Sequence, residues 1–202
     1  MADVSNKNIK GAVSDERLSG LRRHSEEMNR VVVESLQGAL LQLITKKSYD
    51  SITVTELCKK AGVSRMAFYG NFASKDEIMQ KILFDLHGEL VSRIGSPFIQ
   101  AVTYNWYLDM FRFAAEKAEI LKSIFYGGDQ GKYLELVNSM ILRHKDMQSD
   151  DTYQRLLWSG GIVNAVVYWL SDDMAETPEQ MAQFCDKCFA TFYLKSYMGD
   201  NA

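Results

Sequence analysis

Residues 52–78 read ITVTELCKKAGVSRMAFYGNFASKDEI, a stretch that predicts two short helices joined by a sharp turn. Thr53, with Glu56 three residues later, forms a capping box, so a helix is expected to begin directly after Thr53. Gly62 ends this helix at a point where a left-handed residue lets the chain turn sharply. Ser64 then supplies the cap of the next helix. Two helices joined in this way form a helix-turn-helix.

The second of these helices is expected to cover residues 65–71. Phe68 and Phe72 are spaced to face inward against the preceding helices. The opposite face begins with Arg65, Met66 and Ala67, which are short or polar enough to enter a DNA groove. This division of faces is what a recognition helix requires.

The whole stretch, about 27 residues long, closely resembles the DNA-binding signature of the tetracycline-repressor (TetR) family. The shared features are the Ile-Thr opening, the Ala-Gly-Val-Ser turn, the Phe-Tyr pair and the Ser-Lys-Asp-Glu start of the following helix. The resemblance implies base contacts from Arg65, Met66 and Ala67. It implies phosphate contacts chiefly from Tyr69 and Lys75. The full set of expected DNA-binding residues is Thr53, Thr55, Ser64, Arg65, Met66, Ala67, Tyr69, Asn71 and Lys75.

The chain departs from the family pattern at Gly70 and Asn71. Many members carry a larger basic or aromatic residue at the first position and histidine or tyrosine at the second. Gly70 removes one possible phosphate contact and costs about 1 kcal/mol of helix stability relative to alanine. The Asn71 side chain can still bond a phosphate.

Outside this stretch the pattern is helical throughout, which makes the fold class all-α. An amphipathic first helix is expected over residues 29–45, and a capping box at Ser74 opens a long helix that stops before Pro97. Further helices are expected over residues 97–117, 118–126, 130–147 and 151–172. The last helix begins at Thr177-Pro178.

We divide the chain into a flexible arm (1–24), a helix-turn-helix domain (25–73) and a helical effector-binding and dimerisation domain (74–202).

Charge is distributed unevenly along the chain. Residues 1–72 hold 11 Lys and Arg against 8 Asp and Glu, whereas residues 73–202 hold 12 against 18. Binding of a polyanion therefore belongs to the N-terminal third. The longest uncharged stretch covers 16 residues, 156–171, and is too short to span a bilayer. We expect a cytoplasmic protein that does not bind membranes.

The last two helices are expected to form a homodimer. The segments 158–162 (WSGGI) and 168–170 (YWL) resemble a recurrent C-terminal type in the family, in which these helices pair with those of a second subunit as a four-helix bundle. Gly160, Gly161 and Ala165 would let helices approach closely, and an apolar stripe runs from Met181 to Phe192. The alternative is that these residues form a purely intramolecular core.

Aromatic and methionine residues are dense in the middle helices, which suits a cavity for a small apolar or aromatic effector. The expected pocket residues are Trp106, Met110, Phe111, Phe125, Tyr133 and Asn164, with Arg112 and His144 as further polar candidates. Ordinary core packing is the alternative explanation for each of them.

The sequence offers little support for a redox, metal-binding or catalytic function. Cys185 and Cys188 have the spacing of a redox or zinc motif, but they lie inside a predicted helix without a second ligand pair, so packing is the favoured interpretation. We expect no catalytic residues, metal or cofactor. The sequence thus predicts a repressor that an effector releases from a palindromic operator. An activator of the same family, or a helical interaction module without ligand sensing, remains the alternative.

Overall fold

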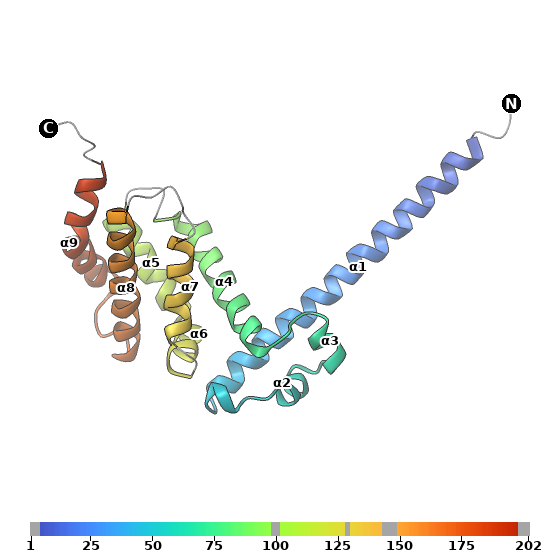
Figure 1. Cartoon of the computed structure of the whole chain (residues 1–202), viewed down its shortest axis with the longest axis horizontal. Helices are drawn as coiled ribbons and strands as arrows, with labels where there is room; N and C mark the ends of the chain where they lie inside the picture. The colour runs from blue at the N-terminus through green and yellow to red at the C-terminus, as the bar shows by residue number, and fades with distance from the viewer. Residues whose placement is uncertain (1–4, 98–101, 128–129, 143–148, 198–202) are drawn as a thin grey trace. The chain divides into compact units, whose positions relative to one another are not determined.

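The computed structural model describes residues 5–97, 102–127, 130–142 and 149–197, and within these ranges the secondary structure is helical without a strand. The predicted all-α class is confirmed (Figure 1). The chain divides into two compact units. One contains Thr53–Ile78 and the residues up to Leu40, and the other contains Leu41–Ile52 and the residues from Met79 onward. The predicted boundary after residue 73 therefore falls inside the first unit.

The first helix, α1 (Ser5–Ile44), is much longer than expected. The sequence analysis began this helix near residue 29 and assigned residues 1–24 to a flexible arm, whereas the structure is helical from Ser5. Every side chain from residue 21 to residue 30 is exposed, so tertiary packing does not hold this part of the helix. Residues 5–44 contain no proline, and a helix satisfies their backbone groups without a partner. Whether the segment is flexible stays a prediction.

The first unit has its core where α1 meets the two helices of the predicted motif, α2 (Val54–Ala61) and α3 (Arg65–Tyr69). The short helix η1 (Tyr49–Ser51) precedes α2 in the chain. The fully buried side chains of this unit are large and apolar and come from every one of its main helices: Leu36, Leu40, Leu57, Phe68 and Ile78. This core fixes α3 against its neighbours.

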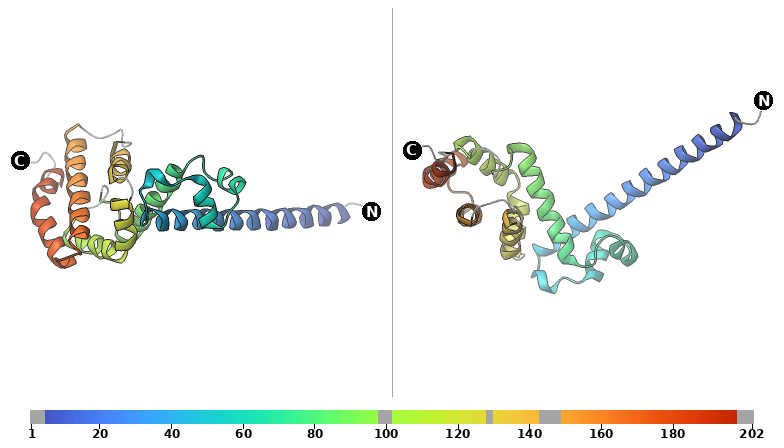
Figure 2. Two further views of the ribbon diagram at one scale, coloured as in Figure 1. Left: turned by 90° about the horizontal axis from the view of Figure 1, so that it is seen from below. Right: turned by 45° about the horizontal axis from the view of Figure 1, so that its top comes forward.

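The second unit starts within α4 (Lys75–Ile94) and continues through α5 (Tyr104–Glu116), α6 (Ala118–Lys122), the π-helical turn η2 (Ser123–Gly127), α7 (Gln130–Leu142), α8 (Ser149–Ser171) and α9 (Pro178–Tyr197). Helix α5 packs against α9, and α7 packs against α8. Helices α8 and α9 lie side by side (Figure 2). The sequence analysis started α5 at residue 97, which is seven residues too early.

Aromatic pairs connect the helices of the second unit. The rings of Phe111 and Trp169 meet edge to face with their centroids 5.3 Å apart, which joins α5 to α8. The rings of Tyr107 and Phe189 stack at 6.5 Å and join α5 to α9. Both distances lie in the range that aromatic pairs prefer, so these contacts add to the energy of burial.

Helix α9 starts at the capping box that the sequence predicts. Thr177 Oγ1 accepts a hydrogen bond from the Gln180 amide at 3.3 Å, and Gln180 Oε1 accepts one from the Thr177 amide at 2.8 Å. The turn before it carries Asp173 and Met174 at positive φ, 49° and 58°. Across this turn, Trp169 Nε1 donates to the Glu176 carbonyl at 2.8 Å. No helix in the described residues is both long and apolar enough to cross a membrane.

Candidate nucleic-acid interface and ligand cavity

The turn between α2 and α3 has the predicted geometry. Gly62 caps α2 with φ of 69°, in the left-handed region that glycine adopts without strain. The amide of Val63 then donates to the Cys58 carbonyl at 3.1 Å, which satisfies the end of α2. Ser64 Oγ accepts a hydrogen bond from the Ala67 amide at 3.0 Å and so starts α3.

Helix α3 has one buried and one exposed face. Phe68 is fully buried and Phe72 is 8% exposed, as the sequence predicts. On the other face, Met66 is 87% exposed and Tyr69 is 54% exposed, with Arg65 exposed beside them. The rings of Phe68 and Tyr69 meet edge to face with their centroids 5.1 Å apart, so the buried ring packs against the exposed tyrosine. A basic, an apolar and a phenolic side chain are therefore presented together to solvent.

The remaining expected DNA-binding residues are placed less uniformly. Thr55 is exposed, while Ala67 and Lys75 are partly buried. Thr53 Oγ1 accepts a hydrogen bond from the Glu56 amide at 3.2 Å, so Thr53, like Ser64, caps a helix. A hydroxyl that accepts such a bond still has a proton to donate to a phosphate oxygen.

Asn71 has a structural role within α3. Its Nδ2 donates to the Ala67 carbonyl at 2.9 Å, and the side chain is partly buried. This bond satisfies the last turn of the helix and uses one of the amide protons that a phosphate contact would need. A phosphate contact from Asn71 stays a prediction, and it would use the second amide proton.

Comparison with known proteins finds relatives of this arrangement. Residues 38–82 match the family model of the bacterial regulatory proteins of the tetR family. The helix-turn-helix segment of the chain is therefore similar to the DNA-binding domain of that family. The chain is also 29% identical over 79 residues to an uncharacterized HTH-type transcriptional regulator, YxbF, of Bacillus subtilis (strain 168). That match covers 37% of this chain and 21% of the relative, so the chain spans about a fifth of the relative's length.

Two solved structures share the fold of this chain. Lin0861 from Listeria innocua superimposes with a TM-score of 0.65 at 16% identity, over 81% of this chain and 91% of that one. A TetR transcriptional regulator from Streptococcus agalactiae 2603V gives a TM-score of 0.61 at 15% identity, over 83% and 98% of the two chains. The likeness therefore extends well beyond the helix-turn-helix.

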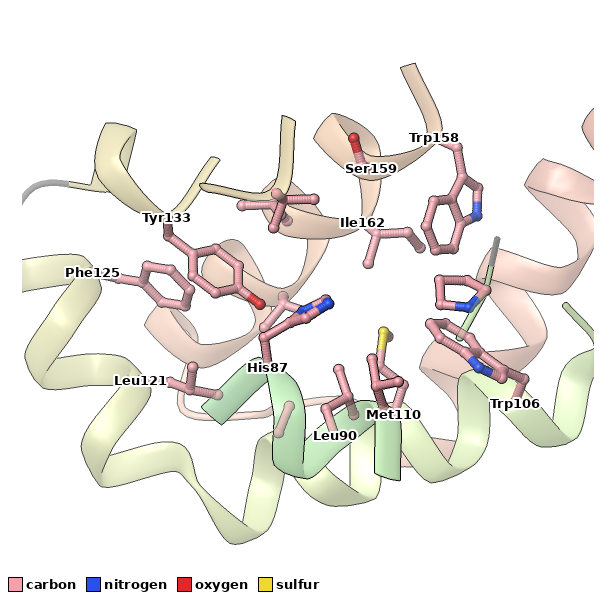
Figure 3. Close-up of a pocket in the computed structure, with 16 residues that line it drawn as sticks. His87, Leu90, Trp106, Met110, Leu121, Phe125, Tyr133, Trp158, Ser159 and Ile162 are labelled. Atoms are coloured by element: carbon pink, nitrogen blue, oxygen red, sulfur yellow. The ribbon is translucent and has the colours of Figure 1, made fainter. Parts of the chain in front are cut away.

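The second unit contains a cavity of about 80 Å³, lined chiefly by residues of α4, α5, α7 and α8 (Figure 3). Four of the six predicted pocket residues line it: Trp106, Met110, Phe125 and Tyr133. The structure does not place the other two there. Phe111 is fully buried against Trp169, and Asn164 is exposed on α8.

The further polar candidates do not reach the cavity either. Arg112 is exposed and pairs with Glu179 at 2.9 Å, while His144 lies outside the described residues. The sequence analysis missed His87, which projects from α4 into the cavity (Figure 3). Its signal is the helical spacing from Leu83, four residues earlier and 1% exposed, which places His87 on the inward face of α4.

Most polar groups in the cavity wall have partners. Trp106 Nε1 donates to the Gly95 carbonyl at 3.2 Å, and Trp158 Nε1 donates to the Tyr107 hydroxyl at 2.9 Å. Ser159 Oγ donates to the Leu156 carbonyl at 3.1 Å. His87 Nδ1, in contrast, is buried and has no hydrogen-bond partner.

The ionisable groups of the cavity wall are held uncharged. Burial lowers the pKa of His87 below its usual value, because desolvation disfavours the imidazolium. Burial raises the pKa of Tyr133 to about 12. The lining residues include no Lys, Arg, Asp or Glu. The wall is therefore apolar and aromatic, with neutral polar groups.

The two cysteines of α9 point into different surroundings. Cys185 is fully buried, and burial raises the pKa of its thiol to about 12, whereas Cys188 is exposed. The predicted packing role thus suits Cys185 but not Cys188. In the described part of the chain, no three His, Cys, Asp or Glu residues are grouped as a metal site would need.

Helices α8 and α9 also expose large apolar side chains. On α8, Tyr153, Leu157 and Tyr168 are 66–70% exposed and recur at helical spacing. On α9, Phe184 is 58% exposed. The stripe that the sequence predicts from Met181 onward is therefore divided, since Cys185 is buried within the chain whereas Phe184 faces solvent. The side chain of Phe192 lies outside the described residues.

Proposed function

We propose that the protein is a transcriptional regulator that binds double-stranded DNA through α3. The observation that carries this proposal is the exposure of Arg65, Met66 and Tyr69 on the face of α3 opposite the buried Phe68. A guanidinium can pair with guanine, and the N-terminal residues of a recognition helix are those that reach base edges. Tyr69 and Lys75 would contact phosphates and fix the register.

We further propose that the protein acts as a homodimer through α8 and α9. The exposed Tyr153, Leu157, Tyr168 and Phe184 give these helices an apolar surface, and large exposed apolar surfaces mark interaction sites. Two-fold symmetry matches a palindromic operator, whose half-sites would present major grooves about 34–36 Å apart.

The proposed mode of action is repression in the cytoplasm, relieved by an effector in the cavity. Helix α4 supports this mode, because it begins at Lys75 beside the DNA-binding residues and carries His87 in the cavity wall. Its last turn is joined to α5 by Arg93, which donates to Glu116 at 2.6 Å. An activator with the same architecture would make the same contacts with DNA, but its binding would increase transcription instead of decreasing it. The proposal includes no enzymatic activity.

Selection of DNA from a random pool by the full-length protein tests the proposed function. A palindromic sequence should be enriched, and its affinity should fall steeply with salt because binding releases counterions. Leu157→Glu should produce monomers and abolish selection of the palindrome, since it places a charge in the proposed interface. Phe84→Glu is the matched control, because Phe84 is also exposed (59%) but lies on α4. Failure to enrich a palindrome, together with indifference to salt, would refute the proposal.

A further inference from the structure

The unpartnered nitrogen of His87 distinguishes one point of an otherwise apolar cavity. A buried polar atom without a hydrogen bond destabilises the fold, and native proteins contain few of them. Here the imidazole lies among aliphatic side chains and four aromatic ones, among them Trp106 and Trp158, whose ring centroids lie 5.7 Å apart (Figure 3).

We propose that the cavity binds a small, uncharged aromatic molecule that donates a hydrogen bond, through a hydroxyl or N–H group, to the imidazole of His87. This inference rests on the proposed effector-binding role of the cavity and names the chemistry of its ligand. The donor would satisfy His87 Nδ1, which has no hydrogen-bond partner among the described residues, and the ring would lie against the apolar wall.

The charge of the ligand follows from the composition of the wall. A ligand with a carboxylate or an ammonium group would lose its hydration on entering the cavity. It would gain no protein group of opposite charge there, because the lining residues include no Lys, Arg, Asp or Glu. His87 does not supply a positive charge at neutral pH, because burial lowers its pKa. A neutral imidazole with its proton on Nε2 accepts a hydrogen bond at Nδ1, so this tautomer is part of the proposal.

The size of the ligand follows from the volume of the cavity, about 80 Å³. Sites for drug-sized ligands are several times larger, and an apolar cavity that accommodates benzene has roughly 150 Å³, so the ligand is at most a single ring and the lining side chains must move apart to admit it. The alternative occupant is an ordered water, which would satisfy His87 but would give the cavity no preference for an aromatic donor.

Two isosteric probes separate these alternatives. p-Cresol and p-xylene differ only by a hydroxyl in place of a methyl group, and p-toluate carries a negative charge on a similar ring. We expect calorimetric titration of the full-length protein at neutral pH to show p-cresol binding about 3- to 10-fold more tightly than p-xylene, the range that one hydrogen bond supplies. Without a partner for the hydroxyl, p-xylene would bind more tightly, since it is the less polar of the two. Binding of p-toluate should be undetectable.

Substitutions then locate the hydrogen bond. His87→Leu should reverse the preference, so that p-xylene binds more tightly, while His87→Gln should restore part of the preference for p-cresol. Ser159→Ala and Tyr133→Phe remove the other side-chain hydroxyls of the wall and should leave the preference in place. Ser159 already donates to the Leu156 carbonyl.

The proposal is overturned if the wild-type protein binds none of the probes, binds p-cresol no better than p-xylene, or binds p-toluate as well as p-cresol. It is also overturned if the preference survives in His87→Leu. These titrations contain no DNA, so their outcome is independent of the selection experiment. A protein that selects a palindrome but fails these titrations retains the proposed regulatory function and loses only the inferred ligand class.

Discussion

Arg65 and Lys75 each occupy the first position of a helix, but their side chains have different surroundings. Arg65 opens α3 with its side chain exposed, and the Ser64 cap at 3.0 Å from the Ala67 amide fixes where that helix begins. Lys75 opens α4 and is partly buried. The exposed side chain of Arg65 suits entry into a DNA groove, and the partly buried side chain of Lys75 suits contact with the phosphate backbone of the duplex.

Substitution of these two residues should have different effects on DNA binding. Arg65→Ala should relax the base preference at one position of each half-site and cost about 1–3 kcal/mol there, because a base-edge hydrogen bond is lost. Lys75→Ala should weaken binding to all sequences alike and reduce the slope of the salt dependence by about one. Comparison of the two selection profiles measures this difference. Identical changes in both profiles would show that the division of roles is wrong.

Local sequence signals predicted the caps and the turn of the helix-turn-helix better than the cavity residues. Thr53, Gly62 and Ser64 act on atoms a few residues away, so their roles could be inferred without knowledge of the fold. Phe111 and Asn164 were assigned to the cavity from composition, which cannot tell the two faces of a helix apart across a bundle. His87 was missed because cavity residues were sought only among the middle helices.

The burial of His87 should make stability depend on pH. Because its pKa is lowered in the folded protein, the unfolded chain takes up the proton at a higher pH than the folded chain does. The free energy of unfolding should therefore fall as the pH decreases from about 7 through the usual histidine pKa near 6.5. Tyr133, the other ionisable residue of the wall, stays protonated throughout this range.

Denaturant unfolding of the wild-type protein and of His87→Gln at pH 7 and pH 5 measures this effect. The loss of stability between the two pH values should be smaller in the variant, and each unit of pKa difference corresponds to about 1.4 kcal/mol. His24 and His144 are present in both proteins, so their contributions cancel. Equal losses would mean that His87 is as easily protonated in the folded protein as in the unfolded chain.

At the scale of the helix, two neighbouring glycines of α8 have different environments. A Cβ on Gly161 would lie 2.9 Å from Phe189 Cζ, whereas a Cβ on Gly160 would have no atom within 4 Å. Both glycines were expected to allow close helix approach. Of the two, Gly161 provides it among the described residues, between α8 and α9.

Alanine substitutions should therefore separate the two positions. Gly160→Ala should stabilise the protein by about 0.5–1 kcal/mol, because alanine restricts the unfolded chain and suits a helix interior. Gly161→Ala has the same advantage but forces Phe189 to move, which typically costs about 1–3 kcal/mol. Denaturant unfolding of both variants at one protein concentration provides the test. If Gly160→Ala is as destabilising as Gly161→Ala, atoms of a second subunit must approach Gly160.

Helix starts could be predicted from the sequence wherever a cap is encoded, as at Thr53, Ser64, Ser74 and Thr177. The start of α5 at Tyr104 could not, because Thr103 makes no side-chain cap hydrogen bond. The extension of α1 back to Ser5 was also missed, because amphipathic periodicity detects helices that bury one face. Side chains 21–30 are all exposed, so that signal is absent.

At the scale of the whole molecule, α4 links the two proposed activities through the chain itself. It starts at Lys75, within the DNA-binding unit, and its later residues His87, Leu90 and Val91 line the cavity of the second unit. A ligand that binds more tightly to one position of α4 than to another shifts the population toward that position. In a dimer, such a shift would change the spacing between the two copies of α3.

Thermodynamic linkage makes this mechanism testable with any compound that binds the cavity. If the compound weakens operator binding by a given factor, then operator DNA must weaken binding of the compound by the same factor, typically about 5- to 150-fold or 1–3 kcal/mol. Calorimetric titration of the compound into the dimer, with and without saturating operator, measures both affinities. Weaker binding on DNA identifies an inducer, as the proposed repression requires. Tighter binding on DNA would identify a corepressor, which strengthens repression instead of relieving it. Equal affinities would show that the compound is not the regulatory ligand, however tightly it binds. A ligand that binds two states equally well does not shift the equilibrium between them.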